Sequence, residues 1–359
     1  MLRRVRFKSA SLLKVLLVLT AAMLAICSLA LVETMNKAEA RSLPQNGKIV
    51  FQRFTSLGGN NAGLYTVDPD GSSLSLLSNK AGGPSAWSPD GTKIAYDSIA
   101  VMDADGSNNR EFPLYHGGTD FEYPTWSPDG TQLAFSTSTP VQSMVPDIYT
   151  SHADGSDLTN ITKSSDVWES APSFSPNGRQ MCFWGGDHKT GFGINIMNSD
   201  GSNPTRLAGH NHNRPVFTCD WSPDGTKIAY SYHPDRGPGY DDVYVMNADG
   251  SGKINLTKSP KVSENSPSWS PDGTKITFSW SDRESPSDSD IYTMDADGTD
   301  VAGVSTNPDA FDTSPDWQPL PGTTDVHQPD TGGPSLLLVA SALLFSGGVL
   351  LYAMVRPRM

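Results

Sequence analysis

Short runs of hydrophobic residues alternate with compact polar turns along most of the chain, and one such unit recurs. In the clearest copy Trp221 ends one run, residues 222–225 read Ser-Pro-Asp-Gly, and residues 227–230 alternate polar and apolar side chains. Proline presets the backbone at the second turn position, and glycine accepts a positive φ at the fourth. Because a two-residue alternation is typical of a strand, each copy predicts a β-hairpin.

Further copies of this hairpin are marked by aromatic residues at Trp87, Trp126, Phe174, Trp269 and Trp317. From Trp126 onward these aromatics follow one another at 47 or 48 residues, whereas Trp87 precedes Trp126 by 39. A second hairpin follows in each unit, with turns such as Asn-Ala-Asp-Gly at residues 247–250. The unit therefore has four strands, named a to d in chain order, and this period indicates a repeat architecture.

The first and last units are incomplete in complementary ways. The unit that begins at Gly47 has strands b, c and d, and residues 313–317 read as a strand a with nothing after it. If the last strand completes the first unit, the chain forms a closed, all-β, six-bladed propeller of four-stranded blades. Radial repetition of this kind leaves only short sheet edges exposed.

The repeat resembles that of TolB-like β-propellers, which are related in shape to WD-repeat propellers. The resemblance is carried by Pro-x-Trp-Ser-Pro-Asp-Gly-x-x-Ile-Ala-Tyr/Phe followed by Asp-Ile-Tyr-x-Met-Asp-Ala-Asp-Gly, over roughly residues 46–319. The copy at Phe174 departs most, with Asn177 in its turn and Met181 and Cys182 in its strand. Propellers of this type also precede serine-peptidase domains, but the sequence has no Gly-x-Ser-x-Gly nucleophile elbow.

The N-terminal segment has the pattern of an export signal. Four basic residues within the first eight precede an apolar run at residues 12–32, and Ala38 and Ala40 are small residues suited to cleavage. Residues 1–40 are therefore predicted to be a signal peptide, with an uncleaved membrane anchor as the alternative.

The C-terminal segment resembles a sortase cell-wall sorting signal. A linker at residues 320–334 contains Gln328, Pro329, Asp330, Thr331 and Gly332; a chargeless span at 335–355 and a basic tail at 356–359 follow. The span is long enough to form a transmembrane helix, and its flanking arginines favour a cytoplasmic tail. The resemblance implies cleavage between Thr331 and Gly332, although Gln328 stands where leucine is usual. Without cleavage the protein is anchored in the plasma membrane, and in both cases residues 41–319 lie outside the cell.

Composition narrows the partners and the compartment. Residues 42–331 contain 17 Lys and Arg against 37 Asp and Glu, which disfavours a nucleic-acid partner. Such acidity is compatible with a cation or a basic ligand. Cys182 and Cys219 are the cysteines of the predicted propeller; they are either buried free thiols or a disulfide between blades, and their spacing does not decide.

The turns and loops predict which face of the propeller is functional. The a–b and c–d turns share one face and are uniform, whereas the b–c and d–a loops share the other and vary. The longest b–c loops are residues 136–146, 185–193, 231–241 and 279–289. Because binding usually resides in variable loops on a rigid scaffold, we expect the functional face on the b–c and d–a side.

Two groups of side chains belong to that face. Glu169, Glu264 and Asp312 each lie five residues before an aromatic, with Glu122 offset by one, so they are candidates for a ligand site at the channel mouth. The alternative is that they bond to local backbone. The second group consists of His188, His210, His212 and His233, with Asp187 and Asp235 nearby. A His-x-His pair with a carboxylate could bind zinc; the alternative is that these are plain surface histidines.

Together these patterns predict an exported, surface-anchored, non-catalytic propeller that binds a protein, a peptide or a cell-wall glycan, or serves as a scaffold. Sortase is an expected partner, and no cofactor is expected unless the histidines hold a divalent cation. The alternative function is a propeller enzyme of the lyase or hydrolase type that uses the histidine cluster.

Overall fold

The computed structural model describes residues 45–55, 63–79, 82–96, 99–112, 121–137, 145–210, 218–233, 240–282, 288–306 and 310–320. The predicted signal peptide, sorting motif, transmembrane span and basic tail all lie outside these ranges. Within them, no helix is long and apolar enough to cross a membrane.

Four sheets stand separately, and each is a four-stranded antiparallel blade. The first consists of β4 (Ser85–Trp87), β5 (Lys93–Tyr96), β6 (Ala100–Asp103) and β7 (Arg110–Glu111). The second consists of β8 (Phe121–Trp126), β9 (Gln132–Thr137), β10 (Ile148–His152) and β11 (Thr159–Asn160). The third consists of β12 (Trp168–Phe174), β13 (Gln180–Asp187), β14 (Gly191–Asn198) and β15 (Thr205–His210). The fourth consists of β16 (Cys219–Trp221), β17 (Lys227–Tyr232), β18 (Asp242–Asn247) and β19 (Ile254–Asn255).

The remaining strands form one eight-stranded sheet. They are β1 (Asn46–Thr55), β2 (Gly63–Val67), β3 (Ser75–Ser78), β20 (Val262–Trp269), β21 (Lys275–Asp282), β22 (Ser289–Asp295), β23 (Ala302–Ser305) and β24 (Ala310–Pro319). The expectation of six separate blades is therefore wrong: four blades are separate, and the strands expected to form two more share one sheet. The physical reason is a single parallel pair between Ser289 and Phe311, because the ten-residue β24 begins early enough to reach the start of β22.

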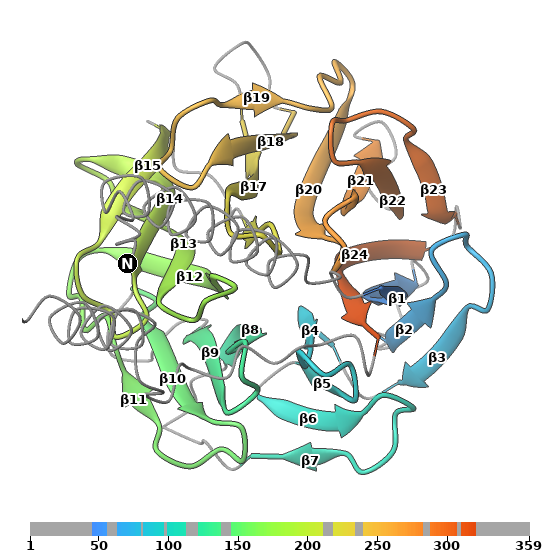
Figure 1. The fold of residues 1–359 in the computed structure, drawn as a ribbon, viewed down its shortest axis with the longest axis horizontal. Coiled ribbons are helices and arrows are strands. Elements are labelled where there is room, and N and C mark those ends of the chain that lie inside the picture. The colour runs from blue at the N-terminus through green and yellow to red at the C-terminus, as the bar shows by residue number, and fades with distance from the viewer. Residues whose placement is uncertain are drawn as a thin grey trace, which may run out of the picture.

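The expected ring closure is confirmed. Strand β24 pairs antiparallel with β1, with Trp317 opposite Ile49 and Asp316 opposite Val50. Figure 1 shows the resulting ring, in which β4, β8, β12, β20 and β24 lie nearest the centre and β3, β7, β11, β15, β19 and β23 lie at the rim. Strand a of each unit therefore borders the central channel.

The Ser-Pro-Asp-Gly turns form as the sequence predicts. In the turn after Trp221, the amide of Gly225 donates to the carbonyl of Ser222 at 2.8 Å, and φ of Gly225 is +70°. The Asp224 carboxylate accepts from the Ser222 hydroxyl at 2.6 Å and from the Thr226 amide at 2.9 Å. These bonds satisfy the backbone groups that a tight turn leaves unpaired, and the same amide-to-carbonyl bond forms in the turns after Trp87, Trp126, Phe174 and Trp269.

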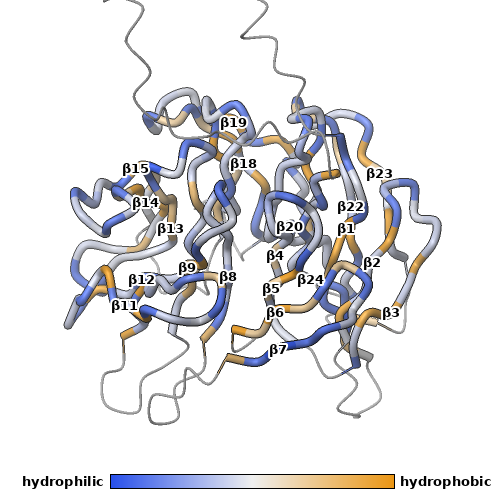
Figure 2. Tube along the Cα trace, turned by 60° about the horizontal axis from the view of Figure 1, so that its bottom comes forward, coloured by the Kyte–Doolittle hydropathy of each residue, from blue (hydrophilic) through white to orange (hydrophobic). Residues whose placement is uncertain are grey.

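Hydrophobic side chains are buried where neighbouring blades face each other. Hydrophobic and hydrophilic residues alternate along the strands (Figure 2), as the two-residue period requires. Trp221 is 5% exposed and packs in a cluster that includes Trp184 of the preceding blade and Tyr230 of its own. The aromatic residue that marks each repeat is thus part of the joint between blades.

We predict that Trp221→Ala lowers the free energy of unfolding by about 3–5 kcal/mol, because it leaves a large cavity between two blades. Chemical denaturation of the purified protein measures this. Ile254→Ala is the matched control: Ile254 is 56% exposed on the outer strand β19, so its loss should change stability by about 0.5 kcal/mol or less. Equal losses for the two variants would contradict burial of the Trp221 ring.

Candidate functional site

A cavity of about 1380 Å³, here called the funnel, opens on the face formed by the a–b turns. The tryptophans of the repeat line it, namely Trp87, Trp126, Trp221, Trp269 and Trp317. Turn prolines line it as well, namely Pro89, Pro128, Pro176, Pro223 and Pro271. The hollow thus lies on the face with uniform turns, opposite to the face on which the sequence pattern predicted binding.

Two aspartates lie at the inner end of the funnel, each directly before the tryptophan of its unit. The carboxylate of Asp220 in β16 accepts a hydrogen bond from the Ser173 hydroxyl at 3.0 Å and from the Trp269 amide at 2.8 Å. That of Asp316 in β24 accepts from the Ser268 hydroxyl at 3.0 Å and from the Trp87 amide at 2.7 Å. Each carboxylate therefore connects the blade before its own with the blade after it.

The electrostatics of this pair favour a positively charged ligand. Burial raises the pKa of Asp220 to about 6 and that of Asp316 to about 7, and the charge of Asp220 contributes to the rise at Asp316. No lysine or arginine is among the described residues that line the narrow cavity behind the pair. A cation placed there would stabilise both ionised carboxylates.

That narrow cavity, here called the constriction, has a volume of about 110 Å³ and is lined by strand a of every unit. Five of its lining residues are prolines, namely Pro84, Pro124, Pro172, Pro267 and Pro315. The residue before four of them has a positive φ of 52° to 55°, at Tyr123, Ala171, Ser266 and Ser314. The pairing register shifts at each of these points, so a β-bulge turns strand a along the channel wall.

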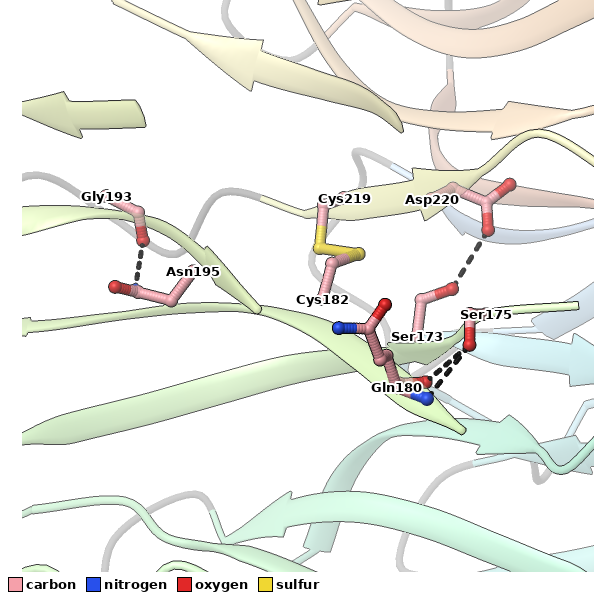
Figure 3. Close-up of a disulfide and its surroundings, with 8 residues drawn as sticks. All are labelled: Ser173, Ser175, Gln180, Cys182, Gly193, Asn195, Cys219 and Asp220. Carbon is pink, nitrogen blue, oxygen red and sulfur yellow. Dashed lines mark hydrogen bonds between the residues drawn. A yellow bond between two sulfur atoms is a disulfide. The ribbon is translucent and has the colours of Figure 1, made fainter. Parts of the chain in front are cut away.

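Cys219 occupies the wall position that proline holds in most other units, and it forms a disulfide with Cys182 of the preceding blade. Their Cα atoms are 6.3 Å apart, within the usual range for a disulfide. Figure 3 shows this bond beside the hydrogen bond from Ser173 to Asp220. The alternative of two free thiols is thus not what the structure shows, and a crosslink of this span contributes about 2–4 kcal/mol.

Two of the expected channel-mouth carboxylates lie buried at blade junctions. Glu169 is 8% exposed and accepts from the Ser164 hydroxyl at 2.9 Å; Glu264 is 2% exposed and accepts from the Thr257 hydroxyl at 3.2 Å. Burial raises the pKa of each to about 7. In both cases the hydroxyl belongs to the connection from the preceding blade, which indicates a role in joining blades.

The other two predicted channel-mouth carboxylates, Asp312 and Glu122, have different surroundings. Asp312 is fully buried and forms two hydrogen bonds of 2.6 Å with the guanidinium of Arg53 on the neighbouring strand β1. Glu122 pairs with Ser136, which places Phe121, and not Glu122, in the register position of Glu169. None of these four carboxylates is among the residues that line the funnel or the constriction. A ligand site formed by them at the opposite mouth of the channel stays a prediction.

The expected histidine cluster is not assembled by the described residues. His188 is exposed at the turn between β13 and β14, with its ring centre 5.6 Å from that of Phe192. His233 is 3% exposed, and its Nδ1 lies 3.1 Å from the carboxylate of Asp241. The side chain of His210 and all of His212 lie outside what is described. No group of three or more metal-ligating side chains within the described ranges is placed to hold an ion.

Asp220 and Asp316 were missed by the sequence analysis, although a signal for them was present. The residue directly before the repeat aromatic is alanine, threonine or serine in the other units, at Ala86, Thr125, Ser173 and Ser268. Two aspartates at a position otherwise filled by small residues mark a departure from the repeat. Comparing the copies position by position would therefore have identified both residues.

We predict that the free energy of unfolding falls as pH rises from about 4.5 to 7. Glu169, Glu264 and Asp316 keep their protons in the folded protein up to about pH 7, whereas carboxylates of an unfolded chain lose theirs near pH 4. The folded state then binds more protons than the unfolded state. Deprotonation of each group over this pH range therefore lowers the free energy of unfolding by about 1–3 kcal/mol. Urea unfolding at pH 5, 6, 7 and 8 measures the slope.

Glu264→Gln tests the assignment, because the amide stays neutral at every pH. The variant should show a shallower slope, and Glu111→Gln, at an exposed position of β7, should keep that of the wild type. A stability that rises between pH 5 and 8 would contradict the raised pKa values.

Comparison with known proteins agrees with this fold. Residues 184–337 match the family model described as the TolB beta propeller domain. TolB from Acinetobacter baumannii superposes with a TM-score of 0.62 at 21% identity, covering 77% of this chain and 68% of that one. A putative TolB from Agrobacterium tumefaciens superposes with a TM-score of 0.56 at 21% identity. That match covers 76% of this chain and 99% of the other.

A chain of the Kuenenia stuttgartiensis hydrazine synthase superposes with a TM-score of 0.60 at 15% identity, and the match covers 78% of this chain and 48% of that one. No curated protein sequence matches. At such identities the structures share the fold, and the neighbours include an enzyme, so they leave the activity open. Residues 184–337 thus resemble the TolB beta propeller domain, and the described strands have the fold of a β-propeller.

Proposed function

We propose that the protein is an exported, surface-anchored and non-catalytic binding module whose ligand is a polypeptide segment that enters the funnel. The single observation that carries this proposal is the funnel itself, which every unit of the repeat helps to line. A rigid ring with a hollow at its centre offers one site per molecule, without any rearrangement of the blades.

The size of the funnel favours a polypeptide. Small-molecule pockets usually have volumes of about 300–1,000 Å³. The funnel, at about 1380 Å³, exceeds that range and narrows to the constriction of about 110 Å³. This taper suits a chain segment that places its backbone in the wide part and one side chain in the narrow part.

The wall chemistry is that of a binding surface. Tryptophan and proline side chains supply apolar contact, and the turn aspartates Asp90, Asp129 and Asp224 supply polar groups at the rim. Tryptophan is among the residues that contribute most to binding energy in protein interfaces. The carboxylates of Asp220 and Asp316 already accept hydrogen bonds that join blades, which suits groups that hold a fixed position.

The disulfide supports export. Disulfides form and persist in oxidising compartments and are rare in the cytosol of most organisms. The Cys182–Cys219 crosslink is therefore what an exported domain would carry, in agreement with the signal-like pattern of residues 1–40. Anchoring through Thr331 or through residues 335–355 remains part of the proposal on sequence grounds.

The funnel is tested by blocking it. Pro176 lines the funnel from an a–b turn, so Pro176→Trp should obstruct entry, and the first central position of such a turn accepts most residues. Peptides selected from a phage-displayed library on the full-length protein in detergent are the probe. Their affinity, measured by calorimetry, should fall about ten-fold or more in the variant if the tryptophan fills their site.

The control is Pro69→Trp, which makes the same change in the Asp-Pro-Asp-Gly turn at residues 68–71. That turn has the same amide-to-carbonyl bond, from Gly71 to Asp68 at 2.9 Å, but Pro69 is exposed and does not line the funnel. Peptides that bind both variants and the wild type equally would place the binding site elsewhere and overturn the proposal.

Export and anchoring are tested by fractionation of cells that express the protein. Release by wall hydrolases alone indicates sortase attachment, and Thr331→Ala should then move the protein to the detergent-soluble membrane fraction. Cys182 and Cys219 should resist thiol labelling in the denatured protein until a reductant is added. Recovery of the protein in the cytosol with free thiols would contradict export.

A further inference from the structure

We propose that the polypeptide bound in the funnel inserts one lysine side chain into its inner end, where the lysine ammonium binds between Asp220 and Asp316. This inference rests on the proposed function, because it names the chemical group that the funnel receives. It assigns a ligand to two aspartates that the repeat pattern alone does not explain.

Asp316 has acceptor capacity left for such a ligand, and Asp220 adds a second negative charge. The carboxylate of Asp316 accepts from the Ser268 hydroxyl and the Trp87 amide, and the Trp317 amide also bonds to it. An ionised carboxylate has about four acceptor positions, so Asp316 can accept a further donor. Because both aspartates line the funnel and the constriction, they are reached from the wide end of the funnel.

A second, independent observation points to a ligand at the same place. Ser85 lines the constriction and is 8% exposed, yet its hydroxyl has no partner among the described residues. The Thr218 hydroxyl, on the same wall, is likewise buried without a partner. Buried hydroxyls are normally hydrogen-bonded, so these two oxygens are acceptors for a donor that enters the constriction.

The charges of the site favour a cation. No basic residue is among the described lining of the constriction, so no protein cation compensates the two carboxylates there. Burial raises the pKa of both carboxyl groups, and the charge of Asp220 raises that of Asp316 further. Within residues 42–331 acidic residues outnumber basic ones, and this net negative charge also attracts a basic segment toward the propeller.

The shape of the site selects lysine among the basic side chains. The lysine ammonium is compact, has three donors and sits on a flexible four-carbon stem, whereas arginine carries a broad planar group. A constriction of about 110 Å³ admits the tip of one such side chain. The apolar stem would then lie along the tryptophan-lined wall of the funnel, where its methylene groups are removed from water.

Two synthetic peptides test the inference on the full-length protein in detergent. One is acetyl-Gly-Gly-Lys-Gly-Gly-amide; in the other, norleucine replaces lysine and keeps the stem without the ammonium. Calorimetry, together with tryptophan fluorescence from the funnel wall, measures both affinities. The lysine peptide should bind about ten-fold more tightly, as expected for a charge-assisted contact at a buried site.

Variants of the wall locate the contact. Asp316→Asn removes the charge and keeps a carbonyl oxygen as acceptor for Trp87 or Ser268, so it should lower the affinity of the lysine peptide about ten-fold and leave that of the norleucine peptide unchanged. Asp70→Asn, in an exposed turn outside the funnel, is the matched control and should change neither. Thermal melting and circular dichroism report whether each variant is folded.

Ser85→Ala gives a second variant that removes no hydrogen bond between described residues, because within these ranges the hydroxyl has no partner. It should weaken the lysine peptide by about three-fold if that hydroxyl accepts from the ammonium. If Asp316→Asn does not fold, this variant and the comparison of the two peptides on the wild type still decide the question.

Equal affinities of the lysine and norleucine peptides, or indifference of the lysine peptide to the folded wall variants, would overturn the lysine inference. Phage-selected peptides sensitive to Pro176→Trp would then still uphold the funnel as a binding site. Conversely, a lysine preference unaffected by Pro176→Trp would place the ammonium site elsewhere and count against entry through the funnel.

Discussion

The pairing of β24 with β1 is the contact on which the rest of the structure depends. It joins the last described strand to the first, so the blades form a ring and not an open row. Once the ring is closed, strand a of every unit borders the same channel. The residues that directly precede the repeat aromatics therefore lie around one axis. Asp220 and Asp316 are 96 positions apart in the chain, yet both line the same cavity for this reason.

Buried carboxylates serve as joints between blades in two different ways. The charge of Asp312 is neutralised within its own blade by the guanidinium of Arg53, and the Ser305 hydroxyl of the preceding unit donates to the same carboxylate. At the junctions of Glu169 and Glu264 hydroxyl groups donate to the carboxyl group in place of a cation, and burial raises the pKa of each glutamate to about 7. Asp220 and Asp316 combine such a joint with a place on the channel wall, so the groups proposed to meet a ligand are also groups that hold the ring together.

The funnel opens on the face opposite to the variable loops. Variable b–c loops suggested a binding surface, and several of them extend outside the described residues. The funnel lies on the opposite face because the repeat tryptophans and the Ser-Pro-Asp-Gly turns line a space between them. The uniform turns form the wall of the funnel because they are arranged around one axis. At Asp220, Asp316 and Cys219 the residues of the channel wall differ from those of most other units.

The sequence by itself determined the repeat, the hairpin turns, the strand periodicity and the partner of the last strand, because these depend on local backbone preferences and on a missing strand that only one other segment could supply. The tertiary structure alone decided that β22 and β24 share a sheet, that Cys182 meets Cys219, that Glu169 and Glu264 are buried, and which face is hollow. These features depend on how neighbouring blades approach one another in space, and a one-dimensional pattern of alternating residues contains no distances between blades.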